Sequence, residues 1–169
     1  MKYFVRRTVD HDHAWIRELI TQRWGDEFFV VHGTMYYPHE LPGFVAHDEE
    51  GQLLGLATYV IENLACELVT FDSLREGRGV GSSLLDAVKH EGIRAQCTRL
   101  WCITTNDNLP ALRFYQKRGF SIIAVHAKAV EQSRLLKPTI PYTGFGGIPI
   151  QDEIELEAKL TPNERRQGQ

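Results

Sequence analysis

The sequence predicts an α/β (α+β) protein with a single mixed, mostly antiparallel sheet, and two observations carry this prediction. Two β-rich runs, 43–47 and 53–62, flank Asp48-Glu49-Glu50-Gly51, whose acidic residues and glycine suit a hairpin turn, so the sheet begins antiparallel. Later, a strand, a glycine-rich turn that opens a helix, and a second strand follow one another between residues 66 and 104. Such a crossover is right-handed and pairs its two strands in parallel, with the helices packed against the sheet.

Length and composition limit the class of protein further. A chain of 169 residues is about one domain's worth, and we expect one domain over 1–160 and a polar tail over 161–169. No apolar run is long enough to cross a membrane and the N-terminus lacks a signal core, so we expect a cytoplasmic protein that does not bind membranes. A net charge of −3 argues against a nucleic-acid partner. Three cysteines cannot all pair, and we expect them reduced and buried.

In the N-terminal part the sequence predicts a strand over 2–7, followed by a helix that Asp10 or Asp12 can cap. One face of this helix is apolar and contains Trp15, Ile16, Leu19, Ile20 and Trp24. The segment 25–42 has an irregular pattern rich in aromatic residues. It is either core filling beneath a connection or a wall that faces the substrate, since binding residues favour loops.

The second part begins with a strand over 66–71 and a helix that ends near Ala95, with Val80, Leu84, Leu85 and Val88 on its apolar face. A strand over 99–104 precedes a short helix within 106–120, which has an asparagine cap, an early proline and a glycine terminator. We then expect a strand over 120–130, a loop over 138–149 and a last strand over 152–160.

The glycine-rich turn carries Gly77, Gly79 and Gly81 directly before a helix. Glycine lets the backbone approach a ligand closely, and the amides of such a turn and of the helix N-terminus form an anion-binding site that suits a pyrophosphate. No Gly-Lys-Ser/Thr follows, which disfavours phosphoryl transfer from ATP. The third glycine and the ribose-binding acid of a dinucleotide site are also missing, so NAD is disfavoured.

Three motifs together resemble the GCN5-related N-acetyltransferase family. They are a strand that ends Leu68-Val69-Thr70-Phe71, the turn Glu76-Gly77-Arg78-Gly79-Val80-Gly81, and Asn108-x-x-Ala-x-x-Phe-Tyr-x-Lys-x-Gly-Phe. The resemblance covers residues 66–120. It implies the acyl-CoA N-acyltransferase-like fold, in which the central parallel strands splay apart. The family turn usually begins with Arg or Gln, whereas this chain has Glu76 there, preceded by Arg75.

The resemblance also implies a set of cofactor-binding residues. Backbone amides from Arg78 through Ser82 would hold the pyrophosphate of coenzyme A, and the edge of Val69–Phe71 would pair with the pantetheine arm like an added strand. Asn108 matches an asparagine that contacts the cofactor, although a plain helix cap also explains it. The complete set is Val69, Thr70, Phe71, Gly77, Arg78, Gly79, Val80, Gly81, Ser82 and Asn108.

Two residues are implied as catalytic. Tyr115 falls at the family position that protonates the departing thiolate, and the alternative is a tyrosine that packs in the core. Glu67 lies where some family members carry a glutamate that acts through water as general base, and the alternative is a solvent-facing strand residue. His32 and His126 are competing proton acceptors that no spacing supports. No His/Cys/Asp cluster indicates a metal.

The resemblance therefore predicts an enzyme that transfers the acetyl group of acetyl-CoA directly to a primary amine of a small molecule, peptide or protein. An alternative is an inactive acyl-CoA-binding sensor or interaction module. A nucleotide-binding enzyme is a third reading, disfavoured because the phosphate-site lysine is absent. The sequence leaves the acceptor open, and it leaves the oligomeric state open with a homodimer as one alternative.

Overall fold

The computed structural model describes residues 2–75 and 77–161, so Glu76 and nearly all of the expected polar tail lie outside the described residues. Its main feature is a seven-stranded sheet with strand order β1-β4-β5-β6-β7-β9-β8. In that order the strands are β1 (Tyr3–Arg7), β4 (Gly43–Asp48), β5 (Leu53–Glu62), β6 (Ala65–Ser73), β7 (Arg99–Thr105), β9 (Glu153–Lys159) and β8 (Ser121–His126).

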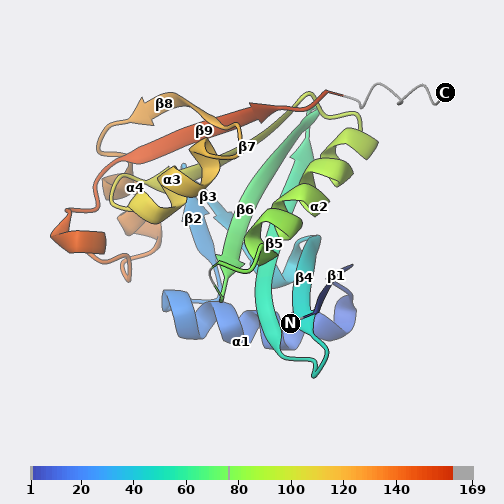
Figure 1. Ribbon diagram of the computed structural model, residues 1–169. Helices are drawn as coiled ribbons and strands as arrows, with labels where there is room; N and C mark the ends of the chain where they lie inside the picture. The colour runs from blue at the N-terminus through green and yellow to red at the C-terminus, as the bar shows by residue number, and fades with distance from the viewer. Residues whose placement is uncertain (1, 76, 162–169) are drawn as a thin grey trace.

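The pairing of these strands confirms the predicted mixed sheet. All neighbours run antiparallel except β6 and β7, which are parallel. Figure 1 shows that the sheet opens between these two strands: β1, β4, β5 and β6 form one arm, and β7, β9 and β8 turn away to form the other. The crossover helix between β6 and β7 is the one that the sequence predicts.

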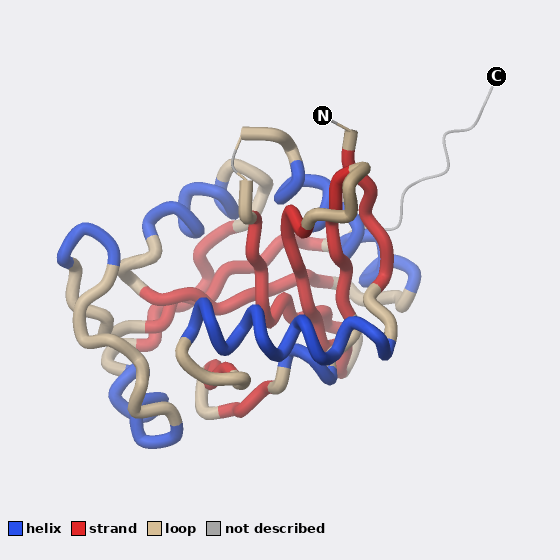
Figure 2. The backbone as a smooth tube through the Cα atoms, turned by 90° about the horizontal axis from the view of Figure 1, so that it is seen from below, coloured by secondary structure: helices blue, strands red, loops and turns tan. Residues whose placement is uncertain are grey.

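The helices lie on both faces of the sheet, and α1 crosses one side of it in the view of Figure 2. They are α1 (His13–Trp24), α2 (Val80–Arg94), α3 (Leu109–Gln116) and α4 (Ala129–Leu136), with short 3-10 helices at Asp10–Asp12, Pro38–Glu40 and Phe145–Gly147. None of the described helices is long and apolar enough to cross a membrane.

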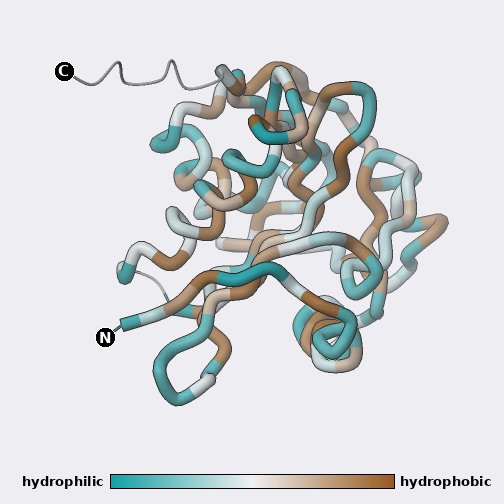
Figure 3. The backbone as a smooth tube through the Cα atoms, turned by 90° about the vertical axis from the view of Figure 1, so that its right-hand side faces the viewer, coloured by the Kyte–Doolittle hydropathy of each residue, from teal (hydrophilic) through white to brown (hydrophobic). Residues whose placement is uncertain are grey.

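Adjacent residues of β5 serve two cores because successive strand side chains point to opposite faces. Leu56 packs with Ile16 and Ile20 of α1, whereas Ala57 belongs to the larger core beneath α2 with Leu84. Figure 3, which colours the backbone by hydropathy, shows hydrophobic and hydrophilic stretches alternating along the chain. The expected apolar face of α2 is buried at all four positions, and the three cysteines are free and buried as predicted.

Asp12 precedes α1 as expected, but its side chain does not cap the helix. Its carboxylate accepts hydrogen bonds from Nη1 and Nη2 of Arg6, at 2.7 and 2.9 Å, and from the indole nitrogen of Trp15, at 2.8 Å. The residue therefore joins the edge strand β1 to the start of α1.

Two segments differ from the sequence-based expectation. The segment 25–42 contains a separate antiparallel hairpin of β2 (Phe29–Val31) and β3 (Thr34–Tyr36). The strand expected over 120–130 ends at His126, and α4 follows. Lys128, the residue before α4, has a left-handed backbone conformation and its side chain does not cap the helix, so the usual signal for a helix start is missing.

Candidate active site

The opening between the two arms of the sheet forms a cavity. Parallel pairing stops at Leu68 and Cys102, so Val69–Ser73 on one arm and Ile103–Thr105 on the other continue without pairing to each other. Both segments line a cavity of about 880 Å³. The splay expected from the family resemblance is thus present, and the unpaired strand edge of Val69–Phe71 faces an open space.

A β-bulge occurs at the point where the strands diverge. Tyr59 pairs with Leu68 and Thr58 pairs with Thr70, so Val69 has no partner on β5. Val69 also lies beyond the last pair with β7. Because a bulge redirects the strand and interrupts its ladder, the backbone of Val69 is available to a ligand in the cavity.

The glycine-rich turn lies at one end of this cavity. Gly77 and Gly79 adopt φ values of +77° and +78°, and Gly79 is the residue before the first turn of α2, with no side chain capping the helix. Gly77, Gly79, Val80, Gly81 and Ser82 all line the cavity, whereas the exposed Arg78 does not. The turn therefore directs a helix N-terminus at the cavity, as an anion site requires.

Basic side chains from α3 and the following turn surround the same end. Arg118 donates from Nε and Nη2 to Ser82 Oγ at 3.1 and 2.8 Å, and its guanidinium lies 3.7 Å from the centre of the Phe114 ring. Arg75, Arg113 and Lys117 also line the cavity. This positive surface suits phosphate groups. Arg113, Lys117 and Arg118 lie within the motif that begins at Asn108, and Arg75 precedes the glycine-rich turn, but the sequence did not identify these four as site residues.

Tyr115 lines the cavity from α3 and is 6% exposed. Its ring lies against Phe71, Phe114 and Phe120, at centroid distances of 6.0, 5.5 and 5.2 Å. Burial raises the pKa of its phenol well above 10, and the neighbouring Cys102 raises this pKa further. The phenol is therefore protonated at neutral pH, and it can give up this proton only to a stronger base.

Asn108 caps α3, since its Oδ1 accepts the backbone N–H of Ala111 at 3.3 Å. Its Nδ2 donates to Thr104 Oγ1 at 3.1 Å. The residue also lines the cavity. The structural role considered for Asn108 is therefore present, and its contact with the cofactor stays a prediction.

Glu67 is 7% exposed and does not line the cavity. Its Oε2 accepts a hydrogen bond of 2.8 Å from the Tyr36 hydroxyl of β3. Burial raises the pKa of the Glu67 carboxyl, and the bond from Tyr36 partly opposes this. Glu67 shares its sheet face with the β2–β3 hairpin, and its role as a base stays a prediction.

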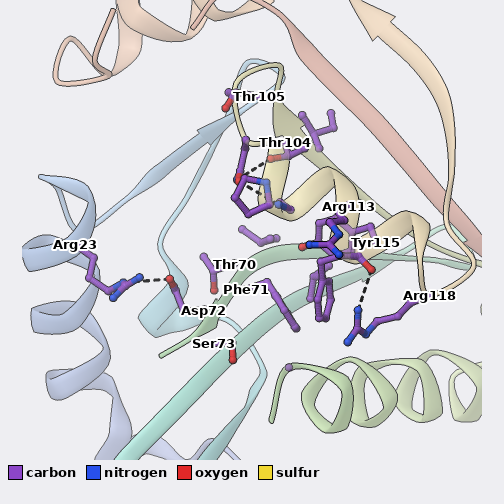
Figure 4. Close-up of a pocket in the computed structure, with 18 of the residues that line it drawn as sticks. Arg23, Thr70, Phe71, Asp72, Ser73, Thr104, Thr105, Arg113, Tyr115 and Arg118 are labelled. Carbon is purple, nitrogen blue, oxygen red and sulfur yellow. Dashed lines mark hydrogen bonds and ion pairs between the residues drawn. The ribbon is translucent and has the colours of Figure 1, made fainter. Parts of the chain in front are cut away.

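The other end of the cavity includes Val30 and Val31 of β2, so the segment 25–42 lines the cavity there, while its Phe29 also packs against the core. Arg23 and Trp24 of α1, Asp72 of β6 and Glu153 of β9 also line this end, and the sequence indicated none of these four as a site residue. Figure 4 shows Arg23 and Asp72 facing each other on the side away from Tyr115 and Arg118. Asp72 is 4% exposed, and its Oδ1 accepts a hydrogen bond of 3.2 Å from Arg23 Nε. The cavity is thus basic at the glycine-rich turn and carries buried carboxylates opposite.

Comparison with known proteins agrees with this geometry. The chain matches the acetyltransferase (GNAT) family over residues 9–120. It is 40% identical to the uncharacterized protein YdhI and 37% identical to the uncharacterized protein YxbD of Bacillus subtilis, in each case over 82% of this chain and 87% of the relative.

Solved structures share the fold. An IAA acetyltransferase from Bacillus cereus has a TM-score of 0.74 at 20% identity and covers 94% of this chain and 100% of its own. A Bacillus subtilis acetyltransferase in complex with CoA has a TM-score of 0.65 at 16% identity, with 95% and 100% covered. An Elizabethkingia anophelis family member with acetyl-CoA bound scores 0.63 at 18% identity, with 94% and 98% covered. By sequence and by fold, this chain belongs to the acetyltransferase (GNAT) family.

Proposed function

We propose that the protein transfers an acetyl group from acetyl-CoA to a primary amine of a small molecule, peptide or protein, without an acyl-enzyme. The observation that carries this proposal is the continuity of one cavity. It joins the anion-binding turn at Gly79, the unpaired strand edge at Val69 and the buried phenol of Tyr115. This order of features suits a ligand with a pyrophosphate, an extended arm and a reactive thioester.

The residues present fit coenzyme A. The turn from Gly77 to Ser82 would hold the pyrophosphate, with Arg118 steadying Ser82, and the edge of Val69–Phe71 would pair with the pantetheine arm. Asn108 would contact the cofactor beside this arm. Acetyl-CoA supplies an activated acetyl thioester when it is bound.

The chain's own groups then serve the transfer. The backbone at the Val69 bulge polarises the thioester carbonyl, because a backbone donor aimed at a developing oxyanion stabilises it. Tyr115 protonates the departing sulfur, because a buried phenol with a raised pKa keeps its proton until a stronger base forms beside it. Glu67, acting through water, takes a proton from the incoming ammonium, which its raised pKa favours.

A panel of amines tests this proposal by the release of free coenzyme A thiol. Melting shifts with coenzyme A, ATP and NAD form the binding control, since a ligand that binds only the folded state raises its melting temperature. We expect a shift with coenzyme A alone and thiol release with at least one amine. A shift without thiol release from any amine would favour the inactive acyl-CoA-binding module instead.

A further inference from the structure

The turn of the β2–β3 hairpin is fastened to β9 by His32. Its backbone N–H donates to Glu153 Oε1 at 3.2 Å, and its ring Nδ1 lies 3.1 Å from Glu153 Oε2. Ser133 of α4 also donates to Glu153, from Oγ to Oε1 at 3.1 Å. Only 4% of the Glu153 side chain is exposed. A buried carboxylate with three donors around it is a fixed acceptor, so it determines how the imidazole sits.

The contact with Glu153 selects the tautomer of His32. An ionised carboxylate only accepts hydrogen bonds, so Nδ1 carries a proton and the lone pair of the neutral ring lies on Nε2. Within residues 2–75 and 77–161, nothing forms a hydrogen bond with His32 Nε2. The His32 side chain is 55% exposed. The basic nitrogen is therefore open to water.

The backbone of His32 is held in an uncommon conformation. Its φ is +47°, in the left-handed region that non-glycine residues seldom adopt. His32 and Gly33, with a φ of +77°, are the two residues of the loop between β2 and β3, and a two-residue hairpin turn of this kind has positive φ at both positions. The turn therefore sets the backbone of His32, and the two contacts with Glu153 fasten that turn to β9.

His32 also lies at the border between the cavity and solvent. Val30, Val31 and Glu153 line the cavity, and His32 directly follows Val31 and contacts Glu153. In Figure 1 the hairpin lies behind the place where β6 and β7 diverge. Glu67, bonded to Tyr36 of the same hairpin, lies deeper and away from the cavity lining. The imidazole is thus a solvent-accessible group beside the end of the cavity that carries the buried carboxylates of Asp72 and Glu153.

The titratable groups that contact His32 lie on β8 and β9, and further contacts link β8 and β9 to β7. The His126 ring of β8 lies 4.4 Å away, and His126 Nε2 is 3.0 Å from Glu155 Oε2 on β9. Arg99 of β7 approaches Glu155 at 3.6 Å. Directly after α4, the ammonium of Lys137 lies over the rings of Phe28 and Phe29, where β2 begins. Glu153 is the charged group that contacts His32 directly.

The proposed reaction releases a proton that needs a route out. The acceptor nitrogen enters as an ammonium and leaves as an amide: one C–N bond forms, the C–S bond breaks, and two N–H bonds break. One proton ends on the coenzyme A sulfur, through Tyr115, and the second must reach solvent. We propose that His32, positioned by Glu153, takes up this second proton at Nε2 through water, since it does not contact Glu67, and passes it to bulk water. This inference rests on the proposed function.

His32→Asn tests the role of the ring, because asparagine tolerates the left-handed backbone that this position requires. We expect kcat/KM for the amine to fall by about 10²-fold at neutral pH, the lower scale of a positioned proton acceptor, with coenzyme A affinity unchanged. Added imidazole should restore much of the rate. His90→Asn is the matched control, since it removes an exposed imidazole of α2 that does not line the cavity, and it should stay within about twofold of wild type.

Two further measurements separate proton transfer from a structural role. In Glu153→Gln, ¹⁵N chemical shifts of the His32 ring should show that the Nδ1–H tautomer no longer predominates, while the fold is retained. Glu67→Gln combined with His32→Asn should be no slower than the slower single variant, because both residues serve one proton route.

The outcomes are distinguishable. A His32→Asn enzyme with the wild-type rate and pH profile while chemistry limits turnover, or one that imidazole does not rescue, overturns this inference and leaves the proposed function intact. Fully additive losses in the double variant also overturn it. A wild-type protein that acetylates no amine removes the proposed function and this inference together.

Discussion

Tyr115 combines deep burial with access to the cavity, and its hydroxyl is the group on which the proposed chemistry depends most directly. Tyr115→Phe should lower kcat by about 10²-fold or more and leave acetyl-CoA affinity unchanged, because it removes a proton donor and keeps the ring. Single-turnover kinetics with calorimetry of cofactor binding measure both quantities.

Tyr59 offers the matched control for this change. It is 3% exposed and burial raises its pKa as well, but it does not line the cavity. Tyr59→Phe should therefore keep kcat near the wild-type value. Equal rates for Tyr115→Phe and wild type, with chemistry limiting, would leave Tyr115 as a packing residue.

Glu67→Gln should lower kcat/KM most at pH values below the pKa of the amine, where a proton must be removed before attack. A raised pKa means that the wild-type carboxylate itself becomes protonated, and fails as a base, at a higher pH than an ordinary glutamate. At high pH free amine is abundant, so the variant should approach the wild-type rate.

A pH series of kcat/KM for wild type and Glu67→Gln checks this expectation. Glu50→Gln, an exposed change in the β4–β5 turn, is the control. Parallel profiles for Glu67→Gln and wild type would show that this carboxylate does not accept the proton.

At the residue scale, the sequence could indicate only the groups that lie in local motifs. Gly79, Asn108 and Tyr115 lie within such motifs, and all three line the cavity. The sequence did not indicate Glu153 as a site residue, because its partner His32 is 121 residues away and no sequence motif contains both residues. Asp72 meets Arg23 across 49 residues for the same reason. Contacts made by tertiary packing leave no periodic signal.

At the scale of one element, the turn before α2 makes a prediction with an internal control. Gly79→Glu should abolish coenzyme A binding, since it adds bulk and negative charge where a pyrophosphate would lie. Gly51, in the β4–β5 turn, has a φ of +79° against +78° for Gly79, and it does not line this cavity. Gly51→Glu should therefore carry a similar backbone strain, about 1 kcal/mol, and keep cofactor binding.

Calorimetry with coenzyme A and thermal melts of both variants measure the two effects separately. Retained affinity in a folded Gly79→Glu protein would remove the basis for placing the phosphates at this turn. Gly81→Glu should also abolish binding, but a Cβ at Gly81 would lie 3.1 Å from Phe114 Cε2, so its effects on fold and ligand are harder to separate.

Elements with strong start and stop signals were predictable. Helix α3 has its asparagine cap and early proline, and α2 has four buried apolar positions on one face. Helix α4 had one usable signal, Pro138 just beyond its end, while its uncapped start favoured a continued strand from β8. The β2–β3 hairpin has strands of three residues each, too short for an alternating pattern to stand out.

At the scale of the whole molecule, the connection rule for a strand, helix and strand predicted the parallel pair, because the handedness of that crossover is nearly invariant. The divergence of β6 and β7 was expected from the family resemblance alone. It depends on where pairing stops, at Leu68 and Cys102, and on the bulge at Val69. Hydrophobic periodicity shows which residues are buried and contains no information about the length of a ladder.

The last prediction concerns the stability of the folded chain and its dependence on pH. Arg6, with smaller contributions from the Val9 amide and the Trp15 indole, holds the pKa of the buried Asp12 carboxyl well below its usual range. A group with a lowered folded-state pKa contributes stability that is fully present above its unfolded pKa, about 3.9, and that is lost as pH falls toward the folded value.

Asp12→Asn should therefore lower the free energy of unfolding at pH 7 by about 2 kcal/mol, the scale of hydrogen bonds to a charged group. The difference from wild type should shrink below about pH 4, with a limiting slope of about 1.4 kcal/mol per pH unit for one proton. Urea unfolding from pH 7 down to pH 3 measures this difference in the free energy of unfolding.

Asp10→Asn, two residues away with an exposed side chain, is the control. It should change neither the free energy of unfolding nor its dependence on pH. A deficit in Asp12→Asn that stays constant through this range would show that Asp12 acts by shape and packing, because a contribution from its charge must disappear as wild-type Asp12 becomes protonated in the unfolded chain.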